Sequence, residues 1–296
     1  HARGSGVVDN EAETEAEAFL QIRQFLSYLP RSVYHLPPRN RCDDETTRRE
    51  EELVSIIPRN RKRIYDARKL LSLVFDKDSL FEIGPRQGRS VVSMLGRLNG
   101  YPVGVMINDT RFFGGGMDAS AAEKTIRFVD MCDTFHLPVV NFSDQPGVVI
   151  GLQAEKAGTV RIAVRVLQTI SQSRVPWVAI MLRKAFGVAG SGYGRQHDLN
   201  LRYAWPSAIW GSLPIEGGVS AAYRREIEAS ENPDARREEL ESYYDQLQSP
   251  FRTAERFGVQ DIIDPRDTRP ILCDWVEQVY EILPEQLGPA YRMMRV

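Results

Sequence analysis

Two adjacent apolar runs constrain the fold of this chain more than any other feature of its sequence. The runs VVSMLGRLNG (91–100) and YPVGVMIND (101–109) meet at Asn99-Gly100, and an Asn-Gly pair between apolar runs is the strongest short-range signal for a β-hairpin. Further apolar runs bounded by turn residues occur at 137–144 and 175–182 and, in shorter form, within 199–211. Each run predicts a buried strand, so the chain is expected to contain a β-sheet.

Amphipathic patterns between and after these runs predict helices. They cover 15–30, 63–75, 121–135, 152–171, 216–229, 233–248 and 267–283. Asp118 or Ser120 can cap the third of these helices, and Asp267 or Thr268 the last. The charged, Pro-punctuated stretch 31–63 is expected to be a solvated loop with one short helix. The unit strand, strand, helix then recurs, which places the chain in the α/β class.

Composition and charge exclude several classes of function. The 296 residues carry 38 Lys and Arg against 40 Asp and Glu, a formal charge of -2, so no nucleic-acid surface is indicated. The cysteines and histidines lack metal-ligand spacing, so we expect no disulfide framework and no metal site, and a reducing compartment fits best. The apolar runs are shorter than the roughly 18–20 residues of a membrane span, and no signal peptide is recognisable.

The stretch FGVAG (186–190) follows the apolar run 175–182 and carries two glycines. If a helix begins near Val188–Ala189, its first backbone N–H groups have no partners within the helix. Two such donors directed at one point form an oxyanion hole. The alternative is a tight turn whose donors bind water.

Two further loops carry glycine where a strand is followed by a helix. FGGGMD (113–118) could allow a ligand to approach the backbone closely, or could serve helix–strand packing. It is neither a GxGxxG nor a P-loop motif, so nucleotide binding is not indicated. In SDQPGVVIG (143–151), Pro146-Gly147 predicts a turn, and Asp144 is either catalytic or, as we prefer, bonded to local backbone.

Few side chains in the sequence fit a catalytic pattern. Glu155 and Arg161 lie six residues apart on one predicted helix and so face different directions. His197 is a lone histidine after a glycine-rich stretch, which is more often structural than a general base. Backbone donors with few side-chain catalysts indicate a reaction in which charge is delocalised onto an oxygen and stabilised by amides.

These motifs together resemble one family. The chain is similar, from about residue 16 to 290, to the C-terminal half of the carboxyltransferase (beta) subunit of biotin-dependent acyl-CoA carboxylases of the propionyl-CoA carboxylase type. The segments that carry the resemblance are FLSYLP (25–30), NGYPVGVMIND (99–109), GGGMD (114–118), RFVDMCDTFHLPVV (127–140), FSDQPGVVIGLQAE (142–155), VPWVAIMLRKAFG (175–187), YAWPSA (203–208) and SPFRTAERFGVQDIIDPRDTR (249–269).

The resemblance implies a crotonase-like fold of stacked strand–strand–helix units with flanking helices. It implies a flexible lead at 1–15 and one biotin-side carboxyltransferase domain at 16–296, with an N-terminal helical arm at 16–80. In the family, the first half of the subunit binds acyl-CoA and the second binds carboxybiotin. The active site forms between the first half of one subunit and the second half of another.

The family pattern RKAYGGA corresponds here to Arg183–Ala189. By resemblance, the backbone N–H groups of Val188 and Ala189 hold the ureido oxygen of biotin and stabilise the charge that reaches it when carboxybiotin releases CO2. The freed ring nitrogen then takes the α-proton of the acyl-CoA. The residues expected to bind biotin are Phe186, Gly187, Pro146, Gly147, Gly115 and Gly116.

The chain departs from the family pattern at several positions. Val188 stands where the family has the second glycine, which keeps the backbone donor but adds a branched side chain. Ser191 takes the acyl-pocket position at which propionyl-type enzymes carry an acidic residue. The family's Arg-His pair is Arg161-Ile162 here, and 212–215 replace its Val-Met-Gly-Ala segment. These differences leave the acyl group open.

Three functions are compatible with these residues and with the resemblance. The first is a carboxyltransferase component that transfers CO2 from carboxybiotin to a short acyl-CoA. Its partners would be an N-terminal carboxyltransferase half, a biotin carboxylase and a biotin carboxyl-carrier, in a hetero- or homo-oligomer without membrane or nucleic acid. The second is a subunit of a biotin-dependent decarboxylase, and the third a non-catalytic structural subunit. The implied location is the cytoplasm, or the mitochondrial matrix in a eukaryote.

Overall fold

The computed structural model describes residues 1–187, 192, 200–211 and 215–295. Its strands are β1 (Phe81–Ile83), β2 (Val91–Leu98), β3 (Tyr101–Asn108), β4 (Val139–Gln145), β5 (Trp177–Phe186), β6 (Leu201–Ala204), β7 (Ile209–Gly211) and β8 (Asp261–Ile262). The described strands form one sheet in the order β1-β2-β3-β4-β5-β6-β8, and β7 also pairs with β5. β1, β2 and β3 pair antiparallel, whereas the pairs from β3 onward are parallel.

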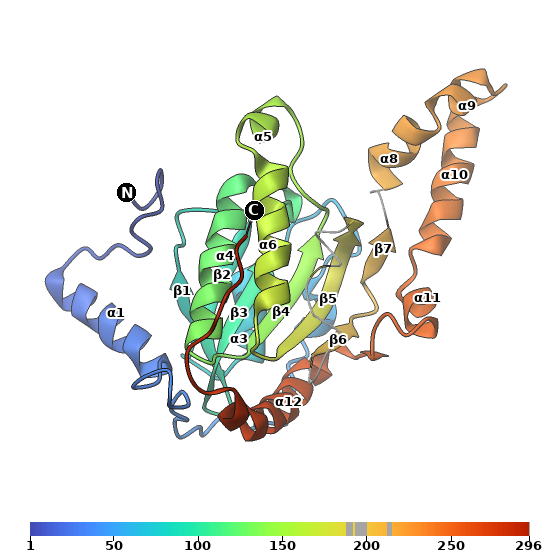
Figure 1. The fold of residues 1–296 in the computed structure, drawn as a ribbon. Helices are drawn as coiled ribbons and strands as arrows, with labels where there is room; N and C mark the ends of the chain where they lie inside the picture. The colour runs from blue at the N-terminus through green and yellow to red at the C-terminus, as the bar shows by residue number, and fades with distance from the viewer. Residues whose placement is uncertain (188–191, 193–199, 212–214, 296) are drawn as a thin grey trace.

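Helices cover both faces of this sheet (Figure 1). The α-helices are α1 (Glu15–Tyr28), α2 (Leu53–Ile56), α3 (Ala67–Val74), α4 (Ala119–Thr134), α5 (Leu152–Lys156), α6 (Thr159–Gln172), α8 (Ile215–Ala222), α9 (Arg224–Ala229), α10 (Pro233–Leu247), α11 (Pro250–Glu255) and α12 (Thr268–Ile282). Short 3-10 turns lie at Phe113–Gly115, Pro265–Asp267 and Leu283–Gln286. Of the described helices, none is long and apolar enough to cross a membrane.

Two hydrophobic cores hold the layers together. On one face, apolar side chains of α4 and α6, such as Val129 and Val166, pack against β2, β3 and β4. On the other face, α3 and α12 contribute Leu70, Val74 and Val276 to a larger cluster. β4 is buried along its whole length because parallel strands with helices on both sides have two buried faces.

The predicted hairpin and the first predicted cap are confirmed. β2 and β3 pair in register from Val91 opposite Asn108 to Leu98 opposite Tyr101. Asn99 and Gly100 both have positive φ, 48° and 80°, as a two-residue hairpin turn of this type requires. Asp118 caps α4 by accepting a hydrogen bond from the Ala121 N–H at 3.1 Å.

The predicted end of the strand at 182 is wrong, because β5 continues to Phe186. The residues Lys184–Phe186 pair with Ile209–Gly211 of β7, and this extra partner keeps RKAF extended. The stretch after the apolar run is therefore strand up to its fourth residue and does not turn at once. The next residue, Gly187, is helical and has a φ of 60°, which favours glycine.

Several predicted helices also differ from the structure. The helix at 152–171 is two helices, because Gly158 adopts a left-handed φ of 67° between α5 and α6. Glu155 and Arg161 therefore lie on different helices. The helix at 216–229 is divided into α8 and α9 at Tyr223. The strand–strand–helix unit holds for β2, β3 and α4, whereas β4 is followed directly by helices.

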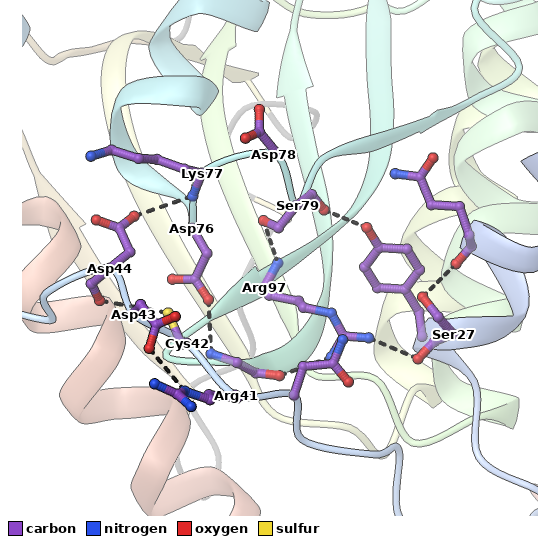
Figure 2. A pocket seen from close by; sticks show the side chains of 14 residues that line it. Ser27, Arg41, Cys42, Asp43, Asp44, Asp76, Lys77, Asp78, Ser79 and Arg97 are labelled. Carbon is purple, nitrogen blue, oxygen red and sulfur yellow. Dashed lines mark hydrogen bonds and ion pairs between the residues drawn. The ribbon is translucent and has the colours of Figure 1, made fainter. Parts of the chain in front are cut away.

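The segment 31–63 contains the single short helix α2 but is not simply solvated. A cavity of about 480 Å³ lies between this segment, the end of α1 and the hairpin turn, as Figure 2 shows. Arg97 is buried beside it and donates hydrogen bonds to the carbonyls of Pro38, Gly100 and Ser27. Arg97 thereby ties the arm to the sheet.

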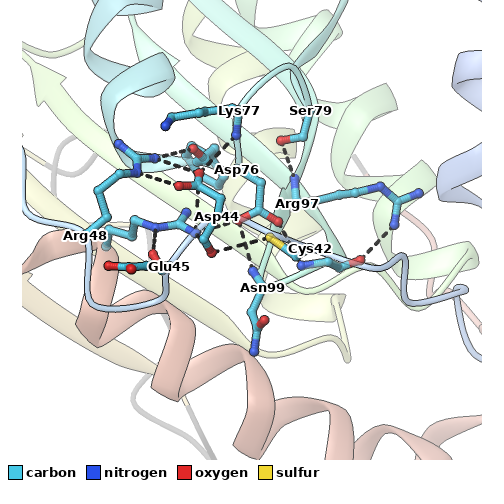
Figure 3. Close-up of polar contacts among 12 residues, drawn as sticks. Cys42, Asp44, Glu45, Arg48, Asp76, Lys77, Ser79, Arg97 and Asn99 are labelled. Carbon is cyan, nitrogen blue, oxygen red and sulfur yellow. Dashed lines mark hydrogen bonds and ion pairs between the residues drawn. The ribbon is translucent and has the colours of Figure 1, made fainter.

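A network of buried ion pairs completes this attachment (Figure 3). Arg48 binds the Asp44 carboxylate through two nitrogens at 2.9 and 3.1 Å. Asp76 accepts a hydrogen bond from Arg269 of α12 at 2.9 Å and two more from the backbone of Asn99 and Gly100. Asp44 and Arg48 of the segment 31–63 therefore serve packing, because they contact each other, Arg269 of α12 and the backbone of Phe75.

Candidate functional site

The carboxyl ends of β3, β4 and β5 meet at one edge of the sheet, since these strands are parallel neighbours. Ligands of parallel α/β sheets usually bind outside this edge. Three segments follow these ends: the glycine loop 111–118 after β3, the Pro146-Gly147 turn after β4, and Gly187 after β5. The structure thus brings together the six predicted biotin-binding residues, all of which are described.

The glycine loop is fixed against the Pro146-Gly147 turn. The Met117 N–H donates to the Gly147 carbonyl at 3.0 Å, and the Val149 N–H donates to the Met117 carbonyl at 2.9 Å. A Cβ on Gly115 would lie 2.4 Å from the Asp144 carbonyl oxygen, so only glycine fits there. Close packing, one of the two alternatives for this motif, therefore explains Gly115.

The backbone donors of this loop are engaged within the loop. The Gly115 N–H donates to the Phe112 carbonyl at 2.9 Å, and the Gly116 N–H donates to the Phe113 carbonyl at 3.0 Å. Gly115 and Gly116 are buried, and Gly147 is half-buried. What Gly115 and Gly116 contribute here is therefore space for close approach and not free N–H donors.

Asp144 connects the ends of three strands. Its carboxylate accepts hydrogen bonds from the Arg183 side chain at 3.0 Å and from the Lys184 backbone N–H at 3.0 Å. Its own N–H donates to Asn108 Oδ1 at 3.1 Å. Asp144 is fully buried, and its carboxylate bonds backbone as preferred, but that backbone belongs to β5, 40 residues away, and is not local.

A cavity of about 330 Å³ opens at this edge. Pro146 and Phe186 line it together with Gly114 of the glycine loop, whereas the other four residues predicted to bind biotin are not among its lining residues. The other lining residues are Arg61, Lys62, Arg63, Ile64, Thr110, Arg183, Lys184 and Ile209. Five of these carry positive charge, and none of the described lining residues is acidic, so the cavity favours an anion or an oxygen that gains negative charge.

Two features of the cavity lining are not predicted from the sequence: the basic residues of 59–63 and the hydroxyl of Thr110. The run RNRKR (59–63) falls within the stretch predicted to be a solvated loop, although four basic residues in five could have marked it. Arg183 donates to the Arg63 carbonyl at 2.9 Å and so holds this run at the cavity. Thr110 lines the cavity, and its buried hydroxyl has no partner among the described residues.

The Asp109 carboxylate near the cavity is neutralised by neighbouring arginines, and the Tyr65 hydroxyl stays protonated. Burial raises the pKa of Asp109, but hydrogen bonds from Arg111 and Arg68 outweigh it and hold that pKa below its usual value. Burial, assisted by the nearby Asp144 carboxylate, raises the pKa of the Tyr65 hydroxyl well above its usual range. Tyr65 is therefore neutral and Asp109 ionised at neutral pH.

The remaining predicted residues fall outside this geometry. Val188, Ala189, Ser191 and His197 lie outside the described residues. The cavity shown in Figure 2 lies at the opposite edge of the sheet, beside the hairpin turn at Gly100. Within the described ranges, no group of three or more His, Cys, Asp and Glu residues is placed to hold a metal ion.

Comparison with known proteins gives a consistent result. Residues 1–279 match the family model of the carboxyl transferase domain. The chain is 36% identical over 271 residues to the propionyl-CoA carboxylase carboxyltransferase subunit of Haloferax mediterranei, covering 91% of this chain and 52% of that protein. It is 30% identical over 276 residues to the methylmalonyl-CoA decarboxylase subunit alpha of Veillonella parvula, covering 93% of this chain and 53% of the relative.

The fold agrees with the same relatives. The crystal structure of transcarboxylase 12S superposes with a TM-score of 0.88 at 29% identity, covering all of this chain and 56% of that one. The predicted α/β, crotonase-like class is confirmed by this superposition. The chain spans about half the length of the curated relatives it matches. From the family match over 279 of 296 residues and the shared fold, this chain belongs to the carboxyl transferase domain family.

Proposed function

We propose that the chain is the biotin-side half of a carboxyltransferase that moves CO2 between carboxybiotin and the α-carbon of a short acyl-CoA. The observation that carries this proposal is the cavity at the carboxyl edge. It is lined by Pro146 and by Phe186, which in sequence comes two residues before Val188 and three before Ala189, the donors that the family pattern assigns to the ureido oxygen.

The residues around this cavity fit a biotin ring. Phe186 and Pro146 offer apolar walls, and Gly147 lies against the Phe186 carbonyl, where a Cβ would be 4.0 Å from its oxygen. The basic residues favour an oxygen that carries negative charge. The Lys184 ammonium donates to the Gly114 carbonyl at 3.1 Å and so fixes the glycine loop across the cavity.

The chain's own contribution is to stabilise negative charge on the ureido oxygen with backbone donors and to keep acidic side chains away from those donors. When bound, carboxybiotin supplies the CO2 and a ureido oxygen that accepts the electron pair. We assign the backbone N–H groups of Val188 and Ala189 as the donors to that oxygen. The Asp144 carboxylate holds the Lys184 N–H and the Arg183 guanidinium, and so positions the end of β5 from which these donors follow. No acidic side chain of the described lining competes for the donors.

A decarboxylase is a second candidate. The subunit alpha of the Veillonella parvula methylmalonyl-CoA decarboxylase is 30% identical to this chain. Such a subunit would use the same cavity to pass CO2 from an acyl-CoA to biotin, because the step is reversible. The two functions differ in the partner: a biotin carboxylase for the first, and a membrane subunit for the second.

Partners of the chain are also part of this proposal. Because it spans about half of its relatives, we propose that an N-terminal carboxyltransferase half supplies the acyl-CoA site. A biotin carboxyl-carrier and a biotin carboxylase would complete the complex, as an oligomer. The three cysteines are free, which fits a reducing compartment such as the cytoplasm or the mitochondrial matrix.

The test is carboxyl transfer by the reconstituted protein. The chain is combined with its N-terminal half, and transfer from malonyl-CoA or methylmalonyl-CoA to free biotin is followed by release of acetyl-CoA or propionyl-CoA. We expect biotin-dependent turnover that needs both halves. A complex that forms but shows no turnover with any short acyl-CoA would support the structural-subunit alternative and contradict this proposal.

A further inference from the structure

The basic segment, defined as residues 59–63 with the sequence RNRKR, is a concentrated positive patch on a chain of formal charge -2. Arg59, Lys62 and Arg63 are exposed, and Arg61 is half-buried. Like charges this close repel one another, and water only partly screens this repulsion, so a run of this kind favours an anionic partner.

The segment is held in a defined shape. The Lys62 N–H donates to Asn60 Oδ1 at 2.9 Å, and the Arg63 N–H donates to the Asn60 carbonyl at 3.0 Å. Arg183 binds the Arg63 carbonyl from β5 at 2.9 Å. These backbone contacts fix the position of the side chains beside the cavity while leaving their charged ends exposed.

The positive charge is only partly neutralised by the chain. Arg61 forms an ion pair with Asp245 of α10 at 2.6 Å. Arg59, Lys62 and Arg63 have no ion-pair partner among the described residues. Lys62 and Arg63 line the candidate biotin cavity, and Arg59 lines a neighbouring cavity of about 550 Å³ that shares Arg61, Arg183 and Ile209 with it.

From this placement, we propose that the basic segment docks an acidic face of the biotin-bearing carrier protein. The inference rests on the proposed function, because a biotin that is tethered to a carrier must reach the cavity past this rim. Positive charge around the entrance would steer an acidic carrier towards it and orient the biotinyl-lysine arm. In this proposal the basic segment binds the carrier protein, whereas the cavity binds the biotin ring.

Biotinylated peptides separate these two roles. The probes are biocytin (biotinyl-lysine), the peptide Glu-Glu-biotinyl-Lys-Glu-Glu, and the same peptide with Gln for Glu, each titrated into the full chain by calorimetry at low and high salt. We expect the acidic peptide to bind more tightly than the Gln peptide, with the difference largely lost at high salt. Because Lys62 and Arg63 also line the biotin cavity, the double variant Lys62→Glu, Arg63→Glu is judged by a ratio: it should weaken binding of the acidic peptide about tenfold more than binding of biocytin.

The matched control is Arg31→Glu, Arg225→Glu, which makes the same change in net charge at two exposed arginines that do not line the cavity. We expect it to leave all three affinities unchanged. Equal binding of the acidic and Gln peptides, or equal weakening by the control, overturns the inference while biocytin binding still supports the proposed function. Binding of the acidic peptide without biotin as tightly as with it, or its displacement by coenzyme A, also overturns the inference. Failure of biocytin and of both peptides to bind contradicts both proposals.

Discussion

Asp144 shows how much of this edge depends on a single side chain. It is fully buried, paired with Arg183, and bonded to the backbone N–H of Lys184. The sequence predicts a local role for this residue because a carboxylate at a strand end usually bonds nearby backbone. Its ion pair with Arg183 is not predictable, because that pair forms only when β4 and β5 lie side by side.

Ala189 carries the sharpest prediction at the scale of residues. If its N–H stabilises the ureido oxygen, Ala189→Pro removes that donor, and turnover of the reconstituted enzyme should fall about 100- to 1000-fold. Ala189→Gly keeps the N–H and serves as the control, which should stay close to the parent rate. A folded proline variant with the parent rate would contradict the assignment.

Ser191 is predicted to set acyl preference and not the rate of the chemistry. Replacing it with Phe should fill space beside the acyl group, so the ratio of activities on acetyl-, propionyl- and butyryl-CoA should change more than their sum. Ser191→Ala, which adds no volume, should preserve the ratios. Ratios that stay constant in the Phe variant would place acyl selectivity elsewhere in the protein.

At the scale of elements, the glycine loop depends on the close contact between Gly115 and β4. In Gly115→Ala, a Cβ would lie 2.4 Å from the Asp144 carbonyl oxygen at a φ of 89°. Overpacking of this kind costs about 1–3 kcal/mol, and positive φ about 1–2 kcal/mol more. We expect a clear fall in the urea midpoint and a loss of transfer activity, because the cavity is shifted.

Gly158→Ala is the matched control for the strain that a positive φ imposes on any residue other than glycine. Gly158 has a φ of 67°, and a methyl group at this position would meet no atom within 4 Å, so the variant carries the strain without the clash. It should lower the free energy of unfolding by only about 1–2 kcal/mol. If both variants lower it equally, close packing at Gly115 is not important for stability.

The elements also show which sequence signals decide a structure locally. The hairpin at Asn99-Gly100 and the cap at Asp118 depend on neighbouring residues, and both predictions are confirmed. The predicted end of β5 is wrong because its last residues are kept extended by β7, a partner 25 residues away in sequence at Lys184 and Ile209. Likewise, a left-handed glycine at 158 within an amphipathic pattern divides a helix without changing its apolar spacing.

At the scale of the molecule, ion pairs join the N-terminal arm to residues 264–269, such as Arg266 with Glu51 at 2.9 Å and Arg269 with Asp44 at 3.6 Å, and carboxylates of this network respond to acid. Hydrogen bonds from Arg266 lower the pKa of Asp264 to about 2. Burial raises the pKa of Asp44, but its contacts with Arg48 and Arg269 outweigh this and hold it below 3.8. A folded-state pKa below the unfolded value means that the unfolded chain binds more protons in this range, so stability is lost as pH falls.

We therefore expect the urea midpoint to fall between pH 4 and pH 2, after little change from this source above pH 5. In Asp264→Asn, the part of the decline due to this carboxylate is absent, so the profile should be shallower. Unfolding followed by fluorescence at several pH values measures both profiles. A midpoint that is constant from pH 5 to pH 2 would show that these carboxylates keep ordinary pKa values in the folded protein.

The fold class and the position of the candidate site can be predicted from sequence because several separate motifs match one family pattern. The ordered motifs indicate the α/β, crotonase-like fold and the edge of the sheet at which the glycine loops meet. They do not indicate that the basic segment lies at the same cavity. Its charges indicate solvent exposure in sequence, and only the folded chain places Lys62 and Arg63 beside Pro146 and Phe186. A charged run acquires a function from its neighbours, and these neighbours lie more than 80 residues away in sequence.

The most direct test of biotin binding at this edge is a crystal structure of the chain with biotin bound. We predict the bicyclic ring in the cavity beside Pro146 and Phe186, with its ureido oxygen about 2.7–3.2 Å from the backbone nitrogens of Val188 and Ala189. A ring bound at another surface, or backbone nitrogens at 188 and 189 that donate to the protein's own carbonyls, would contradict the central claim.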